Sequence, residues 1–258
     1  MSMSGVEWAK ARLAETVAAF ALLTRLPVGL MPVPWMRELR HAAWAYPLVG
    51  AAVGLIGGLT YWIVQGLGVP PVLAAIFAIF ATILATGALH EDGLVDAADG
   101  LGGKSREDRL AIMRDHRIGT YGALALVLSL GVRSAAIALL AEPALVIGAL
   151  IATGAASRAS ATALMAALPQ ARDDGMSIAA GRASTGYAVT AFTLAFAIAW
   201  LALSFVSALG VIIVSLIATA IVGLLARARL GGQTGDVLGA SCQFAECAAL
   251  TLIAALAV

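Results

Sequence analysis

Long apolar stretches alternate with short polar connections along almost the whole chain. Seven stretches reach or approach the roughly 20 apolar residues that a transmembrane helix needs. An eighth, AETVAAFALLTRLPVGLMPVPW, is shorter and rich in proline, and it predicts an interfacial helix followed by an irregular segment. The pattern therefore predicts an all-α, polytopic membrane bundle. The seven predicted spans cover about residues 45–67, 70–89, 120–141, 144–167, 187–208, 210–227 and 237–258.

Composition agrees with this architecture. The chain is 61% hydrophobic and 12% charged, with a mean hydropathy of +0.96, which exceeds what a soluble protein shows. A net charge of +1 offers no broad basic field for nucleic acid. Because no hydrophilic stretch is long enough for a separate soluble domain, residues 1–258 are expected to form one membrane-embedded domain.

Lysine and arginine are confined almost entirely to alternate connections. The connections at 66–71, 141–143 and 207–210 hold none, whereas fourteen of the sixteen basic residues lie in the N-terminal segment and the other connections. The positive-inside rule makes that richer side cytoplasmic. The remaining two, Arg133 and Arg158, fall inside predicted spans at a depth similar to that of Glu246. A lone buried charge is costly, so we expect Glu246 to pair with one of these arginines.

The segment ALHEDGLVDAADGLGG places acidic residues at the end of the second apolar stretch. Asp92, Asp96 and Asp99 follow the spacing i, i+4, i+7 and therefore share one helix face. Clustered carboxylates repel one another unless a cation neutralises them, and all-oxygen ligands indicate Mg²⁺, Mn²⁺ or Ca²⁺ rather than zinc. The alternative is a solvated acidic helix end that pairs with arginines downstream.

Other residues of this segment refine the hypothesis. Its glycines weaken a helix, which favours close approach to a ligand. His90, beside the aspartates, is a candidate for handling a proton. Glu91 is turned about 100° from Asp92 on a helix, so we expect it outside the cluster and expect Glu91→Leu to be mild.

Three further polar segments fall on the same predicted side of the membrane. In MRDHRIGTYG, two arginines offer forked donors for phosphate oxygens, and Gly119 opens a helix whose free N–H groups favour anions. PQARDDG adds Arg172. In RLGGQTGDVLGASCQFAE, a glycine loop precedes Asp236, which is a helix cap or a metal ligand. A basic membrane anchor or simple capping is the alternative for each segment alone, but together the segments suit a metal-complexed diphosphate.

Three of these stretches, LHEDGLVDAADGLGG, IMRDHRIGTYG and LGGQTGDVLGA, resemble in order and spacing the signatures of cobalamin synthase, the adenosylcobinamide-GDP ribazoletransferase family. LLTRLPV, YPLVGAAVG and PQARDDG are also similar, so the resemblance covers nearly the whole chain. Glu91 departs from the pattern, since the family more often has an apolar residue there, and so does SCQFAE, which leaves Gln243 without an assigned role.

The resemblance implies a Mg²⁺-dependent enzyme of the bacterial cytoplasmic membrane whose active face is cytoplasmic. A ribosyl hydroxyl of α-ribazole, or of its 5′-phosphate, would attack adenosylcobinamide-GDP and release GMP. The implied metal ligands are Asp92, Asp96 and Asp99. The implied catalytic residues are His90, Asp92, Asp96, Asp99 and Asp236. The implied substrate-binding residues are Arg114, Arg117, Gly119, Arg158, Arg172, Gly232, Thr234, Gly235 and Glu246.

Two alternatives stay open at this point. A CDP-alcohol phosphotransferase would also displace a nucleotide with aspartates at a helix end, but DGLVDAADG lacks the DGxxAR of that family. An ion-coupled transporter would place ionisable groups near the bilayer midplane, often in inverted repeats, whereas this chain gathers nearly all its acids at one face.

Overall fold

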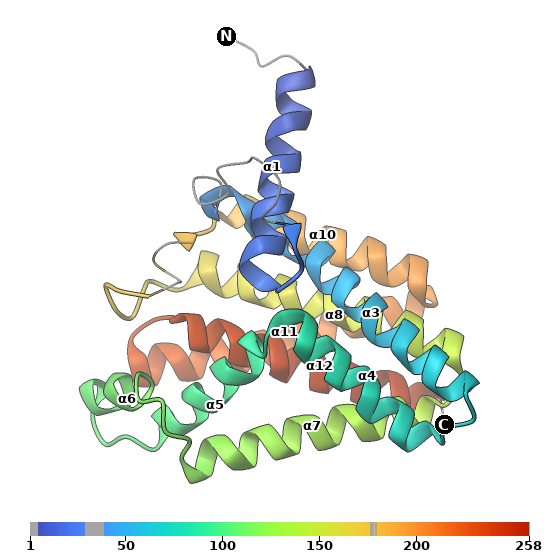
Figure 1. The fold of residues 1–258 in the computed structure, drawn as a ribbon. Coiled ribbons are helices and arrows are strands. Elements are labelled where there is room, and N and C mark those ends of the chain that lie inside the picture. Colours follow the sequence, from blue (N-terminus) through green and yellow to red (C-terminus); the bar gives the residue numbers. More distant parts are fainter. Residues whose placement is uncertain (1–4, 29–38, 176–177, 179, 258) are drawn as a thin grey trace.

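The structure is a computed structural model, and it describes residues 5–28, 39–175, 178 and 180–257. Apart from one isolated bridge between Gln170 and Gln233, the regular structure of these residues is helical, as the apolar pattern predicted (Figure 1). The helices are α1 (Gly5–Leu23), η2 (Leu39–Ala45), α3 (Tyr46–Gly66), α4 (Pro71–Thr86), α5 (Leu89–Leu101), α6 (Arg106–Ile112), α7 (Thr120–Leu140), α8 (Pro143–Ala167), α10 (Thr185–Ala202), α11 (Phe205–Leu230) and α12 (Gly235–Ala257).

Helix α8 forms the centre of the bundle and is the most buried of the long helices. It packs against α3 and α10 on one side and against α11 and α12 on another (Figure 1). Small residues permit this close packing: a Cβ added at Gly50 of α3 would overlap the backbone carbonyl of Gly154 in α8. Close approach of small residues is the usual way in which helices associate within a bilayer, where lipid removes the hydrophobic driving force.

Six helices are long and apolar enough to cross a membrane, and α4 with α5 adds a seventh candidate that is bent by 91°. The side chains of Tyr61 and Gln65, near the end of α3, both donate to the carbonyl of Ala141, just after α7, at 3.0 and 2.8 Å. These hydrogen bonds show that α3 and α7 end on the same side of the bundle. Since α7 must therefore begin on the opposite side, the chain between the end of α3 and the start of α7 crosses the bundle once. Helices α4 and α5 together therefore make one broken crossing.

This broken crossing corrects the predicted second span at 70–89. Helix α4 has only 16 residues and ends at Gly87, which adopts a left-handed conformation with φ of 65°. Ala88 follows with φ of 60°, and the chain turns sharply before α5 begins at Leu89. The acidic segment is consequently a helix of its own, packed against α7 and α12, and not the mouth of a straight span.

Two other boundaries differ from the predicted pattern. The predicted connection at 207–210 is helical, and the break lies earlier, where the hydroxyl of Ser204 caps α11 by accepting from the backbone N–H of Ser207 at 3.1 Å. The N-terminal helix is confirmed as α1, which projects from one side of the bundle (Figure 1). The irregular segment expected after it falls largely on residues 29–38, outside the described residues.

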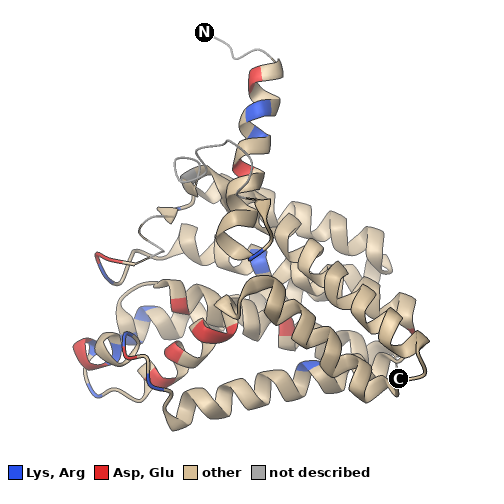
Figure 2. Ribbon diagram, viewed as in Figure 1, with Lys and Arg blue, Asp and Glu red and all other residues tan. Residues whose placement is uncertain are grey.

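Charged residues gather in α5, α6 and the neighbouring loops, while most of the long helices carry few charges along their length (Figure 2). Large hydrophobic side chains are exposed on the outer helices instead. Examples are Phe77 and Phe80 on α4, Leu128 on α7 and Ile217 on α11, each about half exposed or more. So much exposed apolar surface suits lipid and not water, and the chain is an integral membrane protein.

Candidate active site

Two of the three predicted aspartates line a large cavity beside α5. The cavity has a volume of about 610 Å³, and Asp92 and Asp96 contribute to its wall. Its lining also includes Arg114 and Arg117, which the sequence assigned to phosphate, and Arg172, a substrate-binding residue implied by the resemblance. Side chains from three polar segments far apart in the chain therefore meet here, as the prediction of a shared face required.

Two of these arginines, Arg114 and Arg117, are held by exposed carboxylates. Arg114 donates to both oxygens of Asp174 at 2.8 and 2.7 Å, and these hydrogen bonds lower the pKa of Asp174 below its ordinary value. Hydrogen bonds from Arg117 lower the pKa of Asp115 in the same way. Solvent-exposed ion pairs contribute little energy, so an incoming phosphate can replace these carboxylates at small cost.

Asp99 has a different task from its two neighbours. Its carboxylate accepts from the backbone N–H groups of Gly119 at 2.7 Å and of Gly122 at 2.8 Å, so both oxygens bind the first turn of α7. A Cβ at either glycine would overlap this carboxylate. The amides at Gly119 therefore bind Asp99, which corrects the expectation that they are free for a ligand anion. A metal-binding role for Asp99 stays a prediction.

The glycines of α5 also serve packing, and their expected approach to a ligand stays a prediction. A Cβ at Gly93 would lie 3.0 Å from the backbone oxygen of Asp236, so this glycine lets α5 approach α12 closely. Gly100 faces the side chain of Met113 in the same manner. Helix α5 is thus fixed between the bundle and α6, which holds its acidic face steady.

The glycine loop between α11 and α12 is braced against the loop after α8. The backbone N–H of Gln233 donates to Pro169 at 2.8 Å, and that of Ala171 donates to Gln233 at 2.9 Å. A Cβ at Gly232 would overlap the carbonyl of Pro169. Gly232 therefore permits this contact between two chain segments, and its predicted contact with substrate phosphate stays untested.

Thr234 and Asp236 open α12. The buried hydroxyl of Thr234 accepts from the backbone N–H of Val237 at 3.3 Å and donates to Asp236 at 3.2 Å. Arg172 donates to the same carboxylate at 3.2 Å. Thr234 is therefore the side-chain cap of this helix, and Asp236 lies beside Arg172 at the edge of the site. The roles predicted for both in the reaction stay predictions.

A second cavity of about 250 Å³ lies on the other side of Asp92. Asp92 and Arg172 line both cavities, while Asp236, Gly235 and His90 line only the smaller one. His90 is 3% exposed, and its Nδ1 atom has no hydrogen-bond partner among the described residues. A buried polar atom without a partner is costly, and one that faces a cavity is suited to a ligand.

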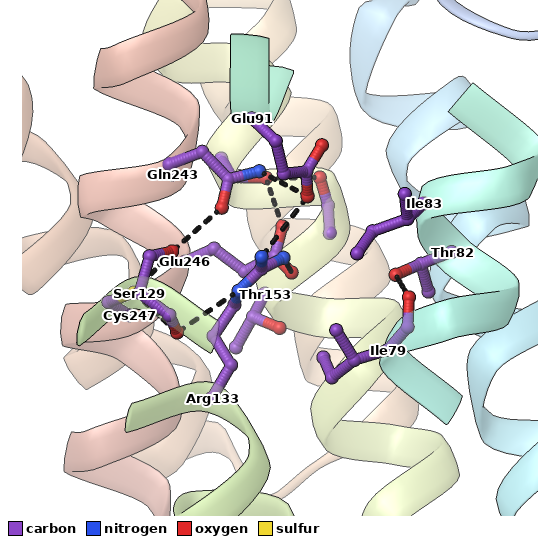
Figure 3. A network of polar contacts seen from close by, with 12 residues as sticks. Ile79, Thr82, Ile83, Glu91, Ser129, Arg133, Thr153, Gln243, Glu246 and Cys247 are labelled. Carbon is purple, nitrogen blue, oxygen red and sulfur yellow. Dashed lines mark hydrogen bonds and ion pairs between the residues drawn. The ribbon is translucent and has the colours of Figure 1, made fainter. Parts of the chain in front are cut away.

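Deeper in the bundle, the remaining predicted residues form a buried network of charges. Arg158 pairs with Glu246 at 2.6 Å. Arg133 pairs with Glu246 at 3.4 Å and with Glu91 at 3.1 Å (Figure 3). The expected pairing of Glu246 is confirmed with both arginines. Gln243 donates to Glu91 at 3.0 Å. Arg158 and Glu246 are therefore held by the network, and their predicted contact with substrate is not tested.

Sequence reasoning missed the role of two members of this network. Glu91 lies outside the aspartate cluster, as expected, but it is 6% exposed and bound to Arg133, so a mild effect of Glu91→Leu is no longer expected. Gln243 is fully buried between Ser129 and Glu91. One signal in the sequence could have revealed the role of Glu91. The interiors of the predicted spans contain two arginines but only one acidic residue, Glu246, so one positive charge still needed a partner.

The donor set suits a hard cation that arrives with substrate. Among residues 5–28, 39–175, 178 and 180–257, no three His, Cys, Asp or Glu side chains are grouped so that they could hold a metal ion alone. Asp92, Asp99 and Asp236 are nevertheless close enough for their negative charges to act on Asp96. Mg²⁺ is usually bound by one or two carboxylates, water and substrate phosphates, and Asp92 with Asp96 fits that pattern.

Comparison with known proteins shows the family of the chain. A family model described as cobalamin-5-phosphate synthase matches residues 15–254. The chain belongs to the cobalamin-5-phosphate synthase family. The predicted resemblance is thereby confirmed over nearly the whole chain, including all four polar segments that carried it.

Several members of this family are similar along their full length, and each is named adenosylcobinamide-GDP ribazoletransferase. The one from Bradyrhizobium diazoefficiens is 46% identical over 252 residues, which cover 97% of this chain and 97% of the relative. The one from Mesorhizobium japonicum is 42% identical, over 94% and 93% of the two chains. The one from Azorhizobium caulinodans is 43% identical, over 92% and 94%. No solved structure matches the chain.

Proposed function

We propose that this chain is an adenosylcobinamide-GDP ribazoletransferase that joins adenosylcobinamide-GDP with α-ribazole, or its 5′-phosphate, and releases GMP. The observation that carries the proposal is the larger cavity, where Asp92 and Asp96 face Arg114, Arg117 and Arg172. Forked guanidinium groups bind phosphate oxygens, and carboxylates bind the cation that accompanies a diphosphate. Family membership supplies the substrate class that such a cavity serves.

The reaction is a displacement at phosphorus. The hydroxyl oxygen of α-ribazole forms a bond with the cobinamide-side phosphorus, the bridging P–O bond breaks, and its electron pair leaves on GMP. The hydroxyl proton passes to a carboxylate of the site or to His90. Arginines of the cavity stabilise the negative charge on the departing phosphate.

We propose Mg²⁺ as the cation, with Asp92 and Asp96 as its protein ligands. When bound, it neutralises the diphosphate and supports the developing charge. The two carboxylates would hold the cation against α5, which is fixed by its contacts with α7 and α12. Asp99 stabilises the position of α5, because its hydrogen bonds with the backbone N–H groups of Gly119 and Gly122 join α5 to the start of α7.

The direct test is an assay of the purified protein in detergent. Incubation with adenosylcobinamide-GDP, α-ribazole and Mg²⁺ should give cobalamin and an equal amount of GMP. Addition of a chelator should stop the reaction, and Mg²⁺ in excess of the chelator should restore it. A transporter would release no GMP, so absence of GMP under all of these conditions would contradict the proposal.

We also propose that the site faces the cytoplasm across the bacterial inner membrane, as the one-sided distribution of basic residues favours. In a variant lacking Cys242 and Cys247, a cysteine in place of exposed Glu107 should resist a membrane-impermeant thiol reagent in intact cells. A cysteine in place of exposed Leu67 should react. Labelling at position 107 and not at 67 would reverse the orientation.

A further inference from the structure

We propose that the smaller cavity is the binding site for the nucleophilic substrate, an aromatic ribonucleoside, while the larger cavity takes the diphosphate. This inference rests on the proposed function and deepens it. It assigns a substrate class to a cavity that the aspartate and arginine motifs alone do not define.

The first observation is the position of the two cavities. Asp92 and Arg172 line both of them, so these two side chains stand where the cavities meet. A reaction that joins two substrates needs the attacking oxygen of one close to the phosphorus of the other, so their two binding sites must meet. The two cavities meet at Asp92 and Arg172, where this carboxylate and this guanidinium group can contact both substrates.

The second observation is the contrast in lining. The larger cavity has three arginines, which suits two phosphates. The smaller one has Arg172 alone, at its shared wall, and is otherwise lined mostly by apolar side chains. Its apolar members come from helices far apart in the chain: Leu22, Leu23, Tyr46, Leu89, Ala161, Met165, Leu238 and Cys242.

Such a lining suits a flat, uncharged ring system. Burial of an aromatic ring against leucine, methionine and tyrosine side chains is favourable, and the ring needs few polar partners. A volume of about 250 Å³ accommodates a compact nucleoside and excludes a much larger substrate. The diphosphate of the bulkier substrate is therefore left to the cavity of about 610 Å³.

The third observation is a buried polar atom that has no use in the fold. His90 lines the smaller cavity, is 3% exposed, and has an Nδ1 atom without a partner among the described residues. A nucleoside offers hydroxyl groups and ring nitrogens that can form the missing hydrogen bond. Since His90 and Asp92 both line the smaller cavity, this bond would hold the ribose in the cavity that Asp92 borders.

Gly235 provides a way to fill the smaller cavity with little damage to the fold. It lines that cavity, and a Cβ added there would meet no heavy atom within 4 Å. Gly131 is a matched control, because it is also a helical glycine with open space around its Cβ, but it is exposed on α7 and lines neither cavity. Gly235→Leu and Gly131→Leu therefore add the same side chain in two different places.

The experiment measures the KM of the purified full-length variants for each substrate separately. Gly235→Leu should raise the KM for α-ribazole about tenfold or more and leave the KM for adenosylcobinamide-GDP unchanged. His90→Phe, which keeps the ring and removes its hydrogen bond, should act on the same substrate. Arg117→Gln should do the reverse, and Gly131→Leu should change neither KM.

The outcomes separate this inference from the proposed function. The cavity assignment is overturned if folded Gly235→Leu raises only the KM for adenosylcobinamide-GDP, raises the KM values for both substrates equally, or changes neither KM. The proposed function stands in each of these cases. If the wild type releases no GMP, the proposed function fails, and equilibrium dialysis with labelled α-ribazole decides the cavity instead. Binding to the wild type and to Gly131→Leu but not to Gly235→Leu would support the assignment, and any other pattern would overturn it.

Discussion

Glu91 and Asp92 are neighbours on α5 and both line the larger cavity, but only Glu91 is held by the buried network. Glu91 is buried, accepts from Arg133 and Gln243, and belongs to a network in which two glutamates balance two arginines. Asp92 is exposed at the junction of two cavities. No hydrogen bond or ion pair to its carboxylate is found in the part of the chain that the structure describes.

This contrast shows how charge is used differently in the two places. In the bundle, every negative charge of the network faces a positive one, because an unpaired charge there is costly. At the cavity, Asp92 and Asp96 form an excess of negative charge beside Arg172, which pairs with Asp236. We infer that the buried network serves structure, whereas Asp92 and Asp96 are available to a cation. The following predictions test this division.

The largest effect is expected from the acids at the cavity. Asp92→Asn or Asp96→Asn keeps the size of the side chain but removes the charge that a hard cation requires. A bound metal supplies several kcal/mol to the transition state, so turnover should fall about 1,000-fold with the folded fraction unchanged. GMP release and thermal unfolding would be measured together, with the exposed acid Glu107→Gln as a control. Near-normal turnover in both variants would place the metal elsewhere.

The buried network should respond in stability. Glu91→Leu leaves Arg133 and Arg158 with a single glutamate, and removal of one partner from a buried ion pair costs about 3–5 kcal/mol. Glu91→Leu combined with Arg133→Leu leaves the neutral pair of Arg158 and Glu246. The double variant should therefore be more stable than Glu91→Leu alone. Unfolding in detergent would show this, and a double variant as unstable as the single one would mean that the charges are not coupled.

A smaller loss of stability is expected at the junction of α5 and α7. Asp99→Asn replaces one accepting oxygen by an amide that cannot accept, so about 1–2 kcal/mol should be lost. Gly119→Ala should also destabilise the protein, because its Cβ would overlap the carboxylate of Asp99. In an Asp99→Ala background most of that penalty should disappear. Equal penalties for Gly119→Ala in both backgrounds would argue against this contact.

The smallest effect on stability is expected from the arginines of the cavity. Arg114 pairs with Asp174, and both side chains are more than half exposed, so Arg114→Gln should leave the unfolding temperature unchanged. The KM for adenosylcobinamide-GDP should nevertheless rise, because a forked phosphate donor is lost. Kinetics and unfolding measured on one preparation would separate the two effects. A lower unfolding temperature with an unchanged KM would make Arg114 a structural residue.

Much of the architecture could be predicted from local properties of the sequence. A helix rises 1.5 Å per residue, so the length of an apolar stretch fixes a span, and the position of a charge within it fixes a depth. This is why the spans, and the pairing of Glu246 with arginines at its own depth, could be predicted. The one-sided basic residues likewise brought the four polar segments to one face before any contact was known.

Contacts between helices were decided only by the tertiary structure. Periodicity states which residues share a face, but the rotation and packing of each helix determine what that face meets. The turn at Gly87 and Ala88 detached α5 from α4 and placed Glu91 against Arg133. The same packing turned Asp99 toward the amides of α7 and left Asp92 and Asp96 at the cavity. Three aspartates that were equivalent in sequence thus acquired different tasks, because each meets a different neighbour.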